Sequence, residues 1–320
     1  MIYNKYFRKL KFFTRGVVSS FLFKLLYRKG FDTSRAIMIF GSTRSGSTWL
    51  AELVSSVPGH SQIFEPLNTQ YVKAAGKAGI IKNTYIKQDD VWNKGNKFFS
   101  GILSGRVMNP WLASQIPVKD VFSTRRLVIK FVRANLLLGW VCKNFDVLPP
   151  ALVIRHPCAY VSSHMQKGWN PSLKVLLSNS YFDGLPEIRE QCLNLTRPEE
   201  LNALAWCLRY HAPLSLTKPY PFILVCYERL VRDGEKEIKR LFRIWDLEIT
   251  KDIINRLGKP SDTVTNSSQI VTGKDPLAGW KRTLSIEQIN NVLNVLYIFK
   301  MDFYSNELEA DYEKLDRFPG

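Results

Sequence analysis

The residues with the clearest chemical potential form a short glycine-containing loop from Gly41 to Thr48, with the sequence GSTRSGST. An apolar run at 36–40 precedes the loop, and apolar residues at helical spacing follow it as far as Pro58. A strand, a glycine-containing loop and a helix in this order point backbone N–H groups and the positive end of the helix at an anion. The sequence therefore predicts a phosphate-binding loop.

The loop departs from the nucleoside triphosphate pattern G-x-x-x-x-G-K-[ST] at one position, because Ser47 stands where that pattern has Lys. In such proteins the Lys reaches the β- and γ-phosphates. The basic residue of this loop is Arg44 instead. We therefore expect a phosphate-bearing ligand other than ATP with Mg²⁺. A P-loop-type nucleotide kinase or NTPase is the alternative within the same fold.

A second candidate anion site follows another apolar run, 151–154. That run ends at Arg155, Pro157 suits the first turn of a helix, and Ser163 falls about two turns along it. An Arg at a strand end and a hydroxyl on the next helix can hold one phosphate together. A surface Arg and an ordinary helical Ser are the alternative interpretation.

Taken together, the two segments resemble a known family. The run Arg44-Ser45-Gly46-Ser47-Thr48-Trp49 resembles the 5′-phosphosulfate loop of sulfotransferases that use 3′-phosphoadenosine 5′-phosphosulfate (PAPS). Arg155 and Ser163, eight residues apart, resemble the 3′-phosphate site of that family. The Arg form of the loop, followed by Phe64-Glu65-Pro66, is closest in motif style to the carbohydrate sulfotransferases. The resemblance implies PAPS as donor, adenosine 3′,5′-bisphosphate (PAP) as product, no metal, and a hydroxyl-bearing acceptor, a sugar or glycan.

The same resemblance implies three more cofactor-binding residues. Tyr227, directly after an apolar run, matches a Tyr that contacts adenine, and Trp49 matches an aromatic that packs on adenine. An aromatic ring holds a nucleotide base by stacking. Core aromatics are the alternative interpretation of both. Lys274 begins a late basic segment, 274–282, which is similar to the loop that closes over the 3′-phosphate.

Sulfuryl transfer needs a base for the acceptor hydroxyl and positive charge at the leaving oxygen. The apolar strand with Lys130 resembles the Lys-bearing strand of the family, which implies that Lys130 and Arg44 stabilise that charge. Cytosolic members place a His base two positions after this Lys, where this chain has Val132. The resemblance therefore implies Glu65 as the base. A helix-capping carboxylate, or one paired with Arg44, is the alternative.

These residues need a scaffold that brings strand ends together. Apolar runs alternate with helical patterns along the chain, which predicts an α/β fold with a parallel β-sheet flanked by helices. Ligands of such sheets lie beyond the carboxyl ends of the strands. We expect strands at 36–40, 61–64, 127–132, 151–154 and 222–226, and helices at 47–57, 158–168, 199–211, 234–246 and 285–300.

The resemblance implies a P-loop-like sulfotransferase domain over 36–320. Segments 67–125 and 170–198 break the alternation and are rich in Gly, Asn, Lys and aromatic residues. We interpret them as insertions that build the acceptor pocket; ordinary surface loops are the alternative.

Positive charge is concentrated at the N-terminus. Residues 1–35 hold nine Lys/Arg and one acid, so they supply +8 of the formal +17. Val17, Phe21 and Leu25 could share one face of a basic amphipathic helix, which could rest on an anionic membrane through residues 1–30. A helix packed on its own domain is the alternative. The uncharged stretch 16–23 is too short to span a bilayer, so we expect a cytoplasmic protein, peripheral to the membrane if the arm binds there.

Other classes of protein receive less support. The sequence shows no helix-turn-helix, zinc-finger or RNP-like pattern, so nucleic acid is not an expected partner. A basic polyanion- or membrane-binding protein without catalysis is the alternative from another class. The five Cys include no C-x-x-C pair, so we expect buried free thiols, with a disulfide as the alternative, and no metal site.

Overall fold

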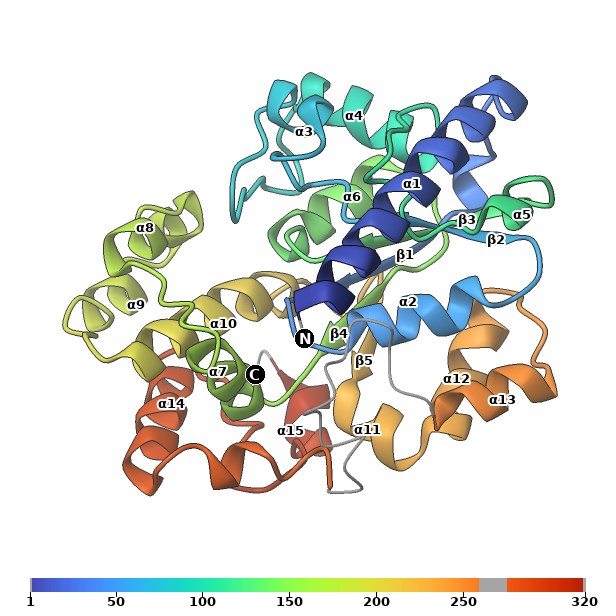
Figure 1. Ribbon diagram of the computed structural model, residues 1–320. Coiled ribbons are helices and arrows are strands. Elements are labelled where there is room, and N and C mark those ends of the chain that lie inside the picture. The colour runs from blue at the N-terminus through green and yellow to red at the C-terminus, as the bar shows by residue number, and fades with distance from the viewer. Residues whose placement is uncertain (1, 259–274, 319–320) are drawn as a thin grey trace.

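The computed structural model describes residues 2–258 and 275–318, with side chains from residue 12 onward. Five parallel strands form its central sheet in the order β2-β3-β1-β4-β5 (Figure 1). Each strand agrees with its predicted run to within one residue at either end. The strands are β1 (Ile37–Gly41), β2 (His60–Phe64), β3 (Arg126–Phe131), β4 (Ala151–Ile154) and β5 (Ile223–Cys226).

The strands read as continuous apolar runs because both faces of the sheet are buried. In β1, Ile37 and Ile39 pack into one hydrophobic cluster, whereas Met38 and Phe40 pack into the other. Lys130 interrupts this pattern near the carboxyl end of β3, where it is only 2% exposed. A buried lysine among apolar neighbours needs a specific partner, which marks this end of the sheet as chemically distinct.

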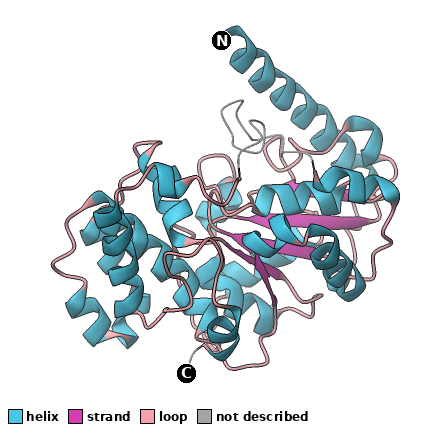
Figure 2. Ribbon diagram, turned by 90° about the horizontal axis from the view of Figure 1, so that it is seen from below, coloured by secondary structure: helices cyan, strands magenta, loops and turns pink. Residues whose placement is uncertain are grey.

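Helices cover both faces of the sheet (Figure 2). Helices α2, α12 and α13 pack on the face of Ile37 and Ile39, and helices α4, α6, α7, α10 and α14 pack on the other. The predicted α/β class, with a parallel sheet flanked by helices, is therefore confirmed. The helices are α1 (Ile2–Leu26), α2 (Ser47–Ser55), α3 (Lys73–Lys77), α4 (Asn93–Leu103), α5 (Val118–Val121), α6 (Leu138–Asn144), α7 (Pro157–Met165), α8 (Leu173–Leu177), α9 (Pro186–Gln191), α10 (Pro198–Leu214), α11 (Tyr227–Arg232), α12 (Gly234–Ile244), α13 (Lys251–Leu257), α14 (Ile286–Ile298) and α15 (Tyr312–Arg317).

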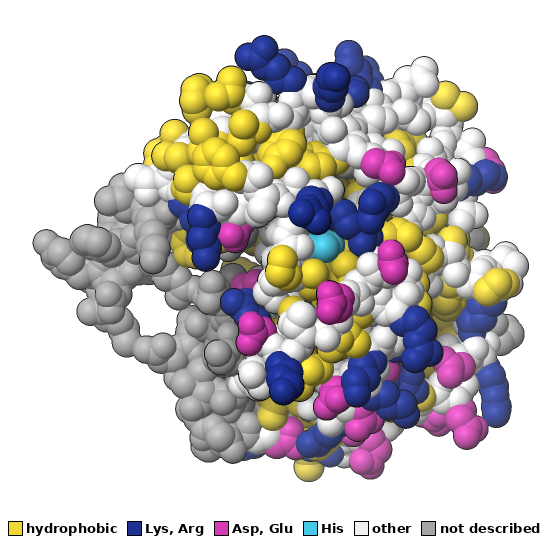
Figure 3. Space-filling view, turned by 90° about the vertical axis from the view of Figure 1, so that its right-hand side faces the viewer, with side chains coloured by type: hydrophobic (Ala, Val, Ile, Leu, Met, Phe, Trp, Pro, Cys, Tyr) yellow, Lys and Arg dark blue, Asp and Glu magenta, His cyan; other side chains and the backbone are white. Residues whose placement is uncertain are grey.

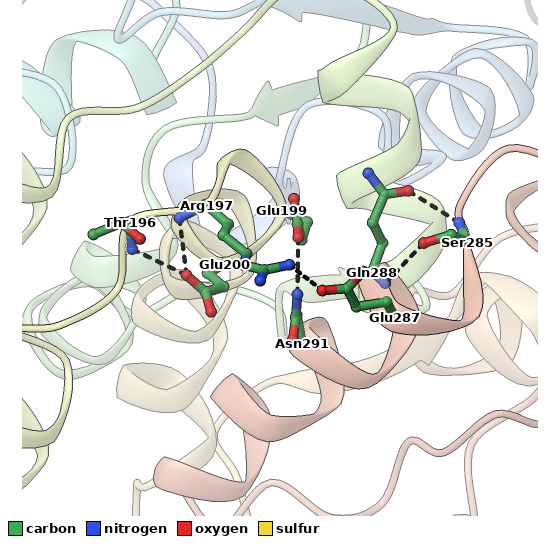
Figure 4. Close-up of polar contacts among 8 residues, drawn as sticks. All are labelled: Thr196, Arg197, Glu199, Glu200, Ser285, Glu287, Gln288 and Asn291. Atoms are coloured by element: carbon green, nitrogen blue, oxygen red, sulfur yellow. Dashed lines mark hydrogen bonds and ion pairs between the residues drawn. The ribbon is translucent and has the colours of Figure 1, made fainter.

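Helices α10 and α14 pack together and support α7 (Figure 4). The start of α14 is a capping box, because the Ser285 N–H donates to Gln288 Oε1 and the Gln288 N–H donates to Ser285 Oγ. Asn291 Nδ2 donates to Glu199 Oε1 at 2.9 Å and ties α14 to α10. The helix expected at 285–300 is therefore present with a capped start, and α7, which carries Ser163, rests on this pair of helices.

Helix α1 lies on the domain through the side that carries Gly16, Ser19 and Phe23. A Cβ on Gly16 would lie 2.1 Å from the carbonyl oxygen of Pro110, so the helix approaches the domain closely there. Ser19 Oγ donates to the carbonyl of Ile116 at 2.9 Å, and Phe23 is buried in the core. The predicted helix is present, and its packed side is not the apolar side that amphipathic spacing favours.

The opposite side of α1 carries exposed apolar residues: Phe13, Val17, Val18, Phe21, Leu25 and Leu26. In Figure 3 hydrophobic side chains gather at the upper left, where α1 crosses this face, and Lys and Arg side chains lie next to them. Across the described ranges, none of the helices has both the length and the apolar character needed to cross a membrane.

All five cysteines are free in the structure, so the free-thiol interpretation is confirmed. Four of them are buried, and Cys142 is half-buried.

Candidate anion-binding and catalytic site

The parallel sheet brings the predicted site residues to one edge. The loop that begins at Ser42 follows β1, Glu65 follows β2, Arg155 follows β4 and Tyr227 follows β5. Lys130 lies near the end of β3, paired in register with Ile39 of the central strand. Because all strands run in the same direction, side chains that are far apart in the sequence meet at this edge.

The loop after β1 adopts a backbone that favours glycine. Arg44 and Gly46 have positive φ values of 68° and 92°. A Cβ on Gly46 would lie 2.3 Å from the ring of Tyr227, so no other residue type fits there without movement. The loop leads directly into α2, whose first N–H groups have no partner within the helix. Within the described chain, the buried hydroxyls of Ser42 and Ser45 also have no hydrogen-bond partner.

Two guanidinium groups meet beside this loop. Arg44 Nε donates to Ser163 Oγ at 3.0 Å, and Arg155 Nη1 donates to the carbonyl of Arg44 at 2.9 Å. The sequence suggested two separate phosphate sites, whereas Arg44 joins them in the structure. Burial lowers the pKa of Arg44, and the neighbouring charge of Arg155 lowers it further. Among the residues that the structure describes, no carboxylate forms an ion pair with either guanidinium.

The two predicted adenine-binding aromatics flank the same loop. The Tyr227 ring is 6% exposed, and the Arg155 guanidinium lies 4.4 Å from its centroid. Trp49 meets Tyr227 edge-on, with centroids 6.3 Å apart, and its buried Nε1 has no partner within the described residues. Tyr227 therefore supports Arg155 and Gly46 in this structure, and contact of either ring with adenine stays a prediction.

A buried carboxylate lies behind Arg155, and the sequence analysis did not assign it a role. Glu228 Oε1 accepts the His156 N–H at 2.8 Å, and Glu228 Oε2 accepts the Tyr304 hydroxyl at 3.2 Å. Burial raises the pKa of Glu228 to about 7. Burial also lowers the pKa of His156 to about 3, and its ring stacks on Trp280 with centroids 4.6 Å apart. The only sequence feature that could have pointed to Glu228 was its place directly after Tyr227 at the end of a strand.

Glu65 pairs with Lys130 at the other side of the loop. Lys130 Nζ donates to Glu65 Oε1 at 3.0 Å and lies 4.5 Å from the Phe64 ring centroid. Burial lowers the pKa of Lys130, and the Glu65 carboxylate opposes this shift. Glu65 has a positive φ of 43°, a strained conformation for a residue with a side chain. The structure thus brings Glu65 to Lys130, and the alternative pairing with Arg44 is not present.

A cavity of about 540 Å³ opens beside the loop and reaches it through Thr43. Thr43 Oγ1 and His164 Nε2 are 3.0 Å apart, and both residues line the cavity. Burial, followed by the charge of Arg209, lowers the pKa of His164 to about 4, so the imidazole is neutral at pH 7. Residues from both predicted insertions, such as Asn83 and Pro171, contribute to the lining. The sequence did not indicate that His164 lines this cavity, because an isolated His on a helix belongs to no recognisable motif.

Lys274 lies outside the described residues. Over the described chain, no group of three or more His, Cys, Asp or Glu residues is arranged to hold a metal ion.

Comparison with known proteins finds no matching family model and no matching curated sequence. Solved structures that resemble the chain include the sulfotransferase domain of the Synechococcus PCC 7002 olefin synthase, with 17% identity, a TM-score of 0.47, and coverage of 85% of this chain and 95% of that one. Mouse sulfotransferase SULT7A1, complexed with PAP, has 12% identity, a TM-score of 0.44, and coverage of 94% of each chain. Sulfotransferase STF9 from Mycobacterium avium has 12% identity, a TM-score of 0.43, and coverage of 87% and 79%. These likenesses are distant, so the function is inferred from the residues of this chain.

Proposed function

We propose that this protein is a PAPS-dependent sulfotransferase that transfers a sulfuryl group to a hydroxyl of a carbohydrate acceptor. The observation that carries the proposal is the meeting of Arg44 and Arg155 beside a helix N-terminus, with neither of them in an ion pair among the described residues. Two cations and a row of N–H donors favour a ligand that carries more than one anionic group.

The polar atoms left without partners fit such a ligand. Ser42 Oγ, Ser45 Oγ and Arg155 Nε are all buried and have no hydrogen-bond partner in the described chain. A buried donor without a partner costs free energy, which a phosphate oxygen would recover. On this proposal Ser45 to Thr48 hold the 5′-phosphosulfate, and Arg155 and Ser163 hold the 3′-phosphate.

The catalytic roles follow from the chemistry of the neighbouring side chains. PAPS, when bound, supplies the sulfuryl group and a phosphate leaving group. Glu65 accepts the proton of the acceptor hydroxyl, as a general base. Lys130 and Arg44 offset negative charge near the loop, since both are cations in a poorly solvated environment.

The nucleotide kinase alternative is less favoured by the loop itself. Ser47 occupies the position of the Lys that would contact the β- and γ-phosphates. The test is transfer of labelled sulfate from PAPS to a panel of sugar acceptors, beside phosphoryl transfer from ATP with Mg²⁺. We expect sulfate transfer alone. Phosphoryl transfer without sulfate transfer would overturn the proposal.

We also propose that the exposed apolar side of α1 binds an anionic lipid bilayer. Phe13 is 64% exposed and Phe21 67% exposed, although the helix is held on the domain by its other side. Lys24, Arg28 and Lys29 are exposed at the same end of the chain, and residues 1–35 carry +8. A helix with exposed aromatics and flanking cations suits the interface of an anionic bilayer.

Vesicle sedimentation tests the membrane proposal. The protein should bind phosphatidylglycerol-containing vesicles and not pure phosphatidylcholine vesicles. A Phe13→Gln/Phe21→Gln/Leu25→Gln variant should lose this binding and keep its thermal stability. Val91→Gln, which changes an exposed apolar residue outside α1, is the matched control. A dimer that dissociates in the triple variant would show instead that a second copy covers this side of α1.

A further inference from the structure

The cavity beside the loop is strongly cationic. Lys82, Arg133 and Arg209 all line it, and the described residues of its lining include no Asp or Glu. Its other walls include the aromatic rings of Tyr160 and Trp169. A sugar ring packs well on aromatic faces, and charged groups nearby then decide which sugars bind.

The side-chain hydrogen bonds of Arg133 and Arg209 go to neutral groups. Arg209 Nε donates to Asn83 Oδ1 at 3.2 Å, and Arg209 Nη1 donates to the Tyr160 hydroxyl. Arg133 Nη1 donates to Asn68 Oδ1 at 3.3 Å. Nowhere in residues 12–258 and 275–318 does a carboxylate form an ion pair with any of the three.

The three cations are also close enough to repel one another. The pKa of Lys82 is lowered by burial and then by the charges of Arg209 and Arg133. Like charges that share a cavity without a counter-charge are unfavourable, and a bound anion relieves their repulsion. A structural role would favour a carboxylate partner within the protein, which this cluster does not have among the described residues.

This cluster is separate from the phosphate-binding cations. Arg44, Arg155 and Ser163 do not line the cavity, whereas Thr43 of the same loop does. His164 connects the cavity to the loop, since it lines the cavity and its Nε2 lies 3.0 Å from Thr43 Oγ1. The cavity thus adjoins the loop and carries its own positive charge.

We propose that the acceptor is an anionic sugar, whose carboxylate or phosphate group binds Lys82, Arg133 and Arg209. This inference rests on the proposed function for the transfer step, and it goes further by naming the class of acceptor. A neutral alcohol or a sterol-like acceptor would leave the three cations without a partner.

Paired ligands test the inference by calorimetry, without any donor. The pairs are methyl glucoside with methyl glucuronide, glucose with glucose 6-phosphate, and glycerol with glycerol 3-phosphate. The protein is first saturated with PAP, so that the phosphate loop is filled. We expect the anionic member of at least one sugar pair to bind tenfold or more tightly than its neutral partner. A preference for glucuronide indicates a carboxylate acceptor, and a preference for glucose 6-phosphate indicates a phosphate acceptor.

Variants assign the preference to the cavity. Lys82→Met and Lys82→Met/Arg133→Met should reduce the anionic preference stepwise, whereas Lys239→Met, an exposed lysine on α12, should leave it unchanged. Equal affinities within every pair, no binding of any anionic member, or an unchanged preference in the double variant would overturn the inference.

Sulfate transfer to the same six compounds separates this inference from the proposed function. Turnover of neutral members alone would keep the sulfotransferase and remove the anionic acceptor. Tight binding of anionic members, with no transfer from PAPS to any compound, would keep the anion site and remove the proposed reaction.

Discussion

At the scale of single residues, Glu65 combines several features of a functional position. It follows a strand end, has a positive φ of 43°, and contacts a buried lysine at 3.0 Å. Strained residues persist where the surrounding structure fixes them, and here the Glu65 N–H donates to the Lys130 carbonyl while its own carbonyl accepts Trp111 Nε1. The backbone of Glu65 is thus held independently of its carboxylate, so a change at the carboxylate should leave the backbone in place.

Replacing Glu65 by Gln should abolish most turnover and preserve PAP binding. Gln keeps the size of the side chain and a hydrogen-bond acceptor for Lys130 but cannot take a proton. Loss of a general base typically costs about 10²–10⁴ in rate. The measurements are sulfate transfer and PAP affinity on the same preparation.

His164→Asn is the matched control, because His164 is the neutral imidazole nearest to the loop. It should retain far more turnover than Glu65→Gln. The reverse order of the two rates would transfer the role of base to His164. His156 is a poor candidate, since its ring is buried and contacts the carbonyl of Ser305.

Replacing Arg155 by Ala should weaken PAP binding by about 1.5–3 kcal/mol, the usual scale of a charged hydrogen bond. Its Nη1 already contacts the loop, and its buried Nε has no partner in the described chain. Arg317→Ala, on the exposed surface of α15, provides the control and should not change affinity. An Arg155→Ala variant with unchanged PAP affinity would exclude Arg155 from the site.

At the scale of elements, the sequence predicted the strands well and the side-chain contacts poorly. Strands buried on both faces are apolar runs, which are visible without a structure. Short helices such as α3, α8 and α9 lack a full periodic pattern, so they were described only as insertions. Arg44 contacts Ser163 and has a positive φ, and no sequence pattern specified either feature. The cavity assembles from segments far apart in the chain, so its charge could not be predicted.

The junction of β5 and α11 predicts a dependence of stability on pH. The pKa of Glu228 is about 7 in the folded protein, above its ordinary value of 4.5, because burial disfavours the carboxylate. The stabilising contribution of the protonated form is therefore complete below about pH 4.5 and is lost as the pH rises through 7.

Glu228→Gln removes this dependence, since Gln stays neutral. The free energy of unfolding of the variant, relative to the native protein, should rise by roughly 2–3 kcal/mol between pH 5 and pH 8, from about 1.4 kcal/mol per pKa unit. Glu313→Gln, an exposed change on α15, should show no such rise. A difference that is the same at both pH values would mean that Glu228 titrates normally.

The two sides of α1 predict opposite effects for neighbouring phenylalanines. Phe23 is 1% exposed, so Phe23→Ala should lower the free energy of unfolding by about 3–5 kcal/mol. Phe21→Ala should change it by less than about 0.5 kcal/mol, because the side chain is mostly exposed. Denaturant unfolding measures both, and equal losses would contradict the packing of the helix. Removing residues 1–30 would also delete Phe23, so point variants are the better probe of the arm.

At the scale of the whole molecule, the net charge of +17 is not spread evenly, and its cations gather at a few places. Cations gather at the loop after β1 and in the adjoining cavity, where no carboxylate of the described residues forms an ion pair with them, and residues 1–35 carry +8. Each of these places favours an anion, and the first combines two Arg side chains with the N-terminus of α2. The central claim is therefore that the loop and Arg155 together recognise a nucleotide with two separated phosphate groups.

Thermal unfolding and calorimetry with PAP, AMP and ATP with Mg²⁺ test this claim most directly. At a concentration 100 times its dissociation constant, PAP should stabilise the protein by about 2.7 kcal/mol. AMP lacks the 3′-phosphate, and this loop lacks the Lys that would contact the β- and γ-phosphates of ATP. Both ligands should therefore bind at least tenfold more weakly than PAP. Equal binding of AMP and PAP, or tighter binding of ATP with Mg²⁺, would contradict the account.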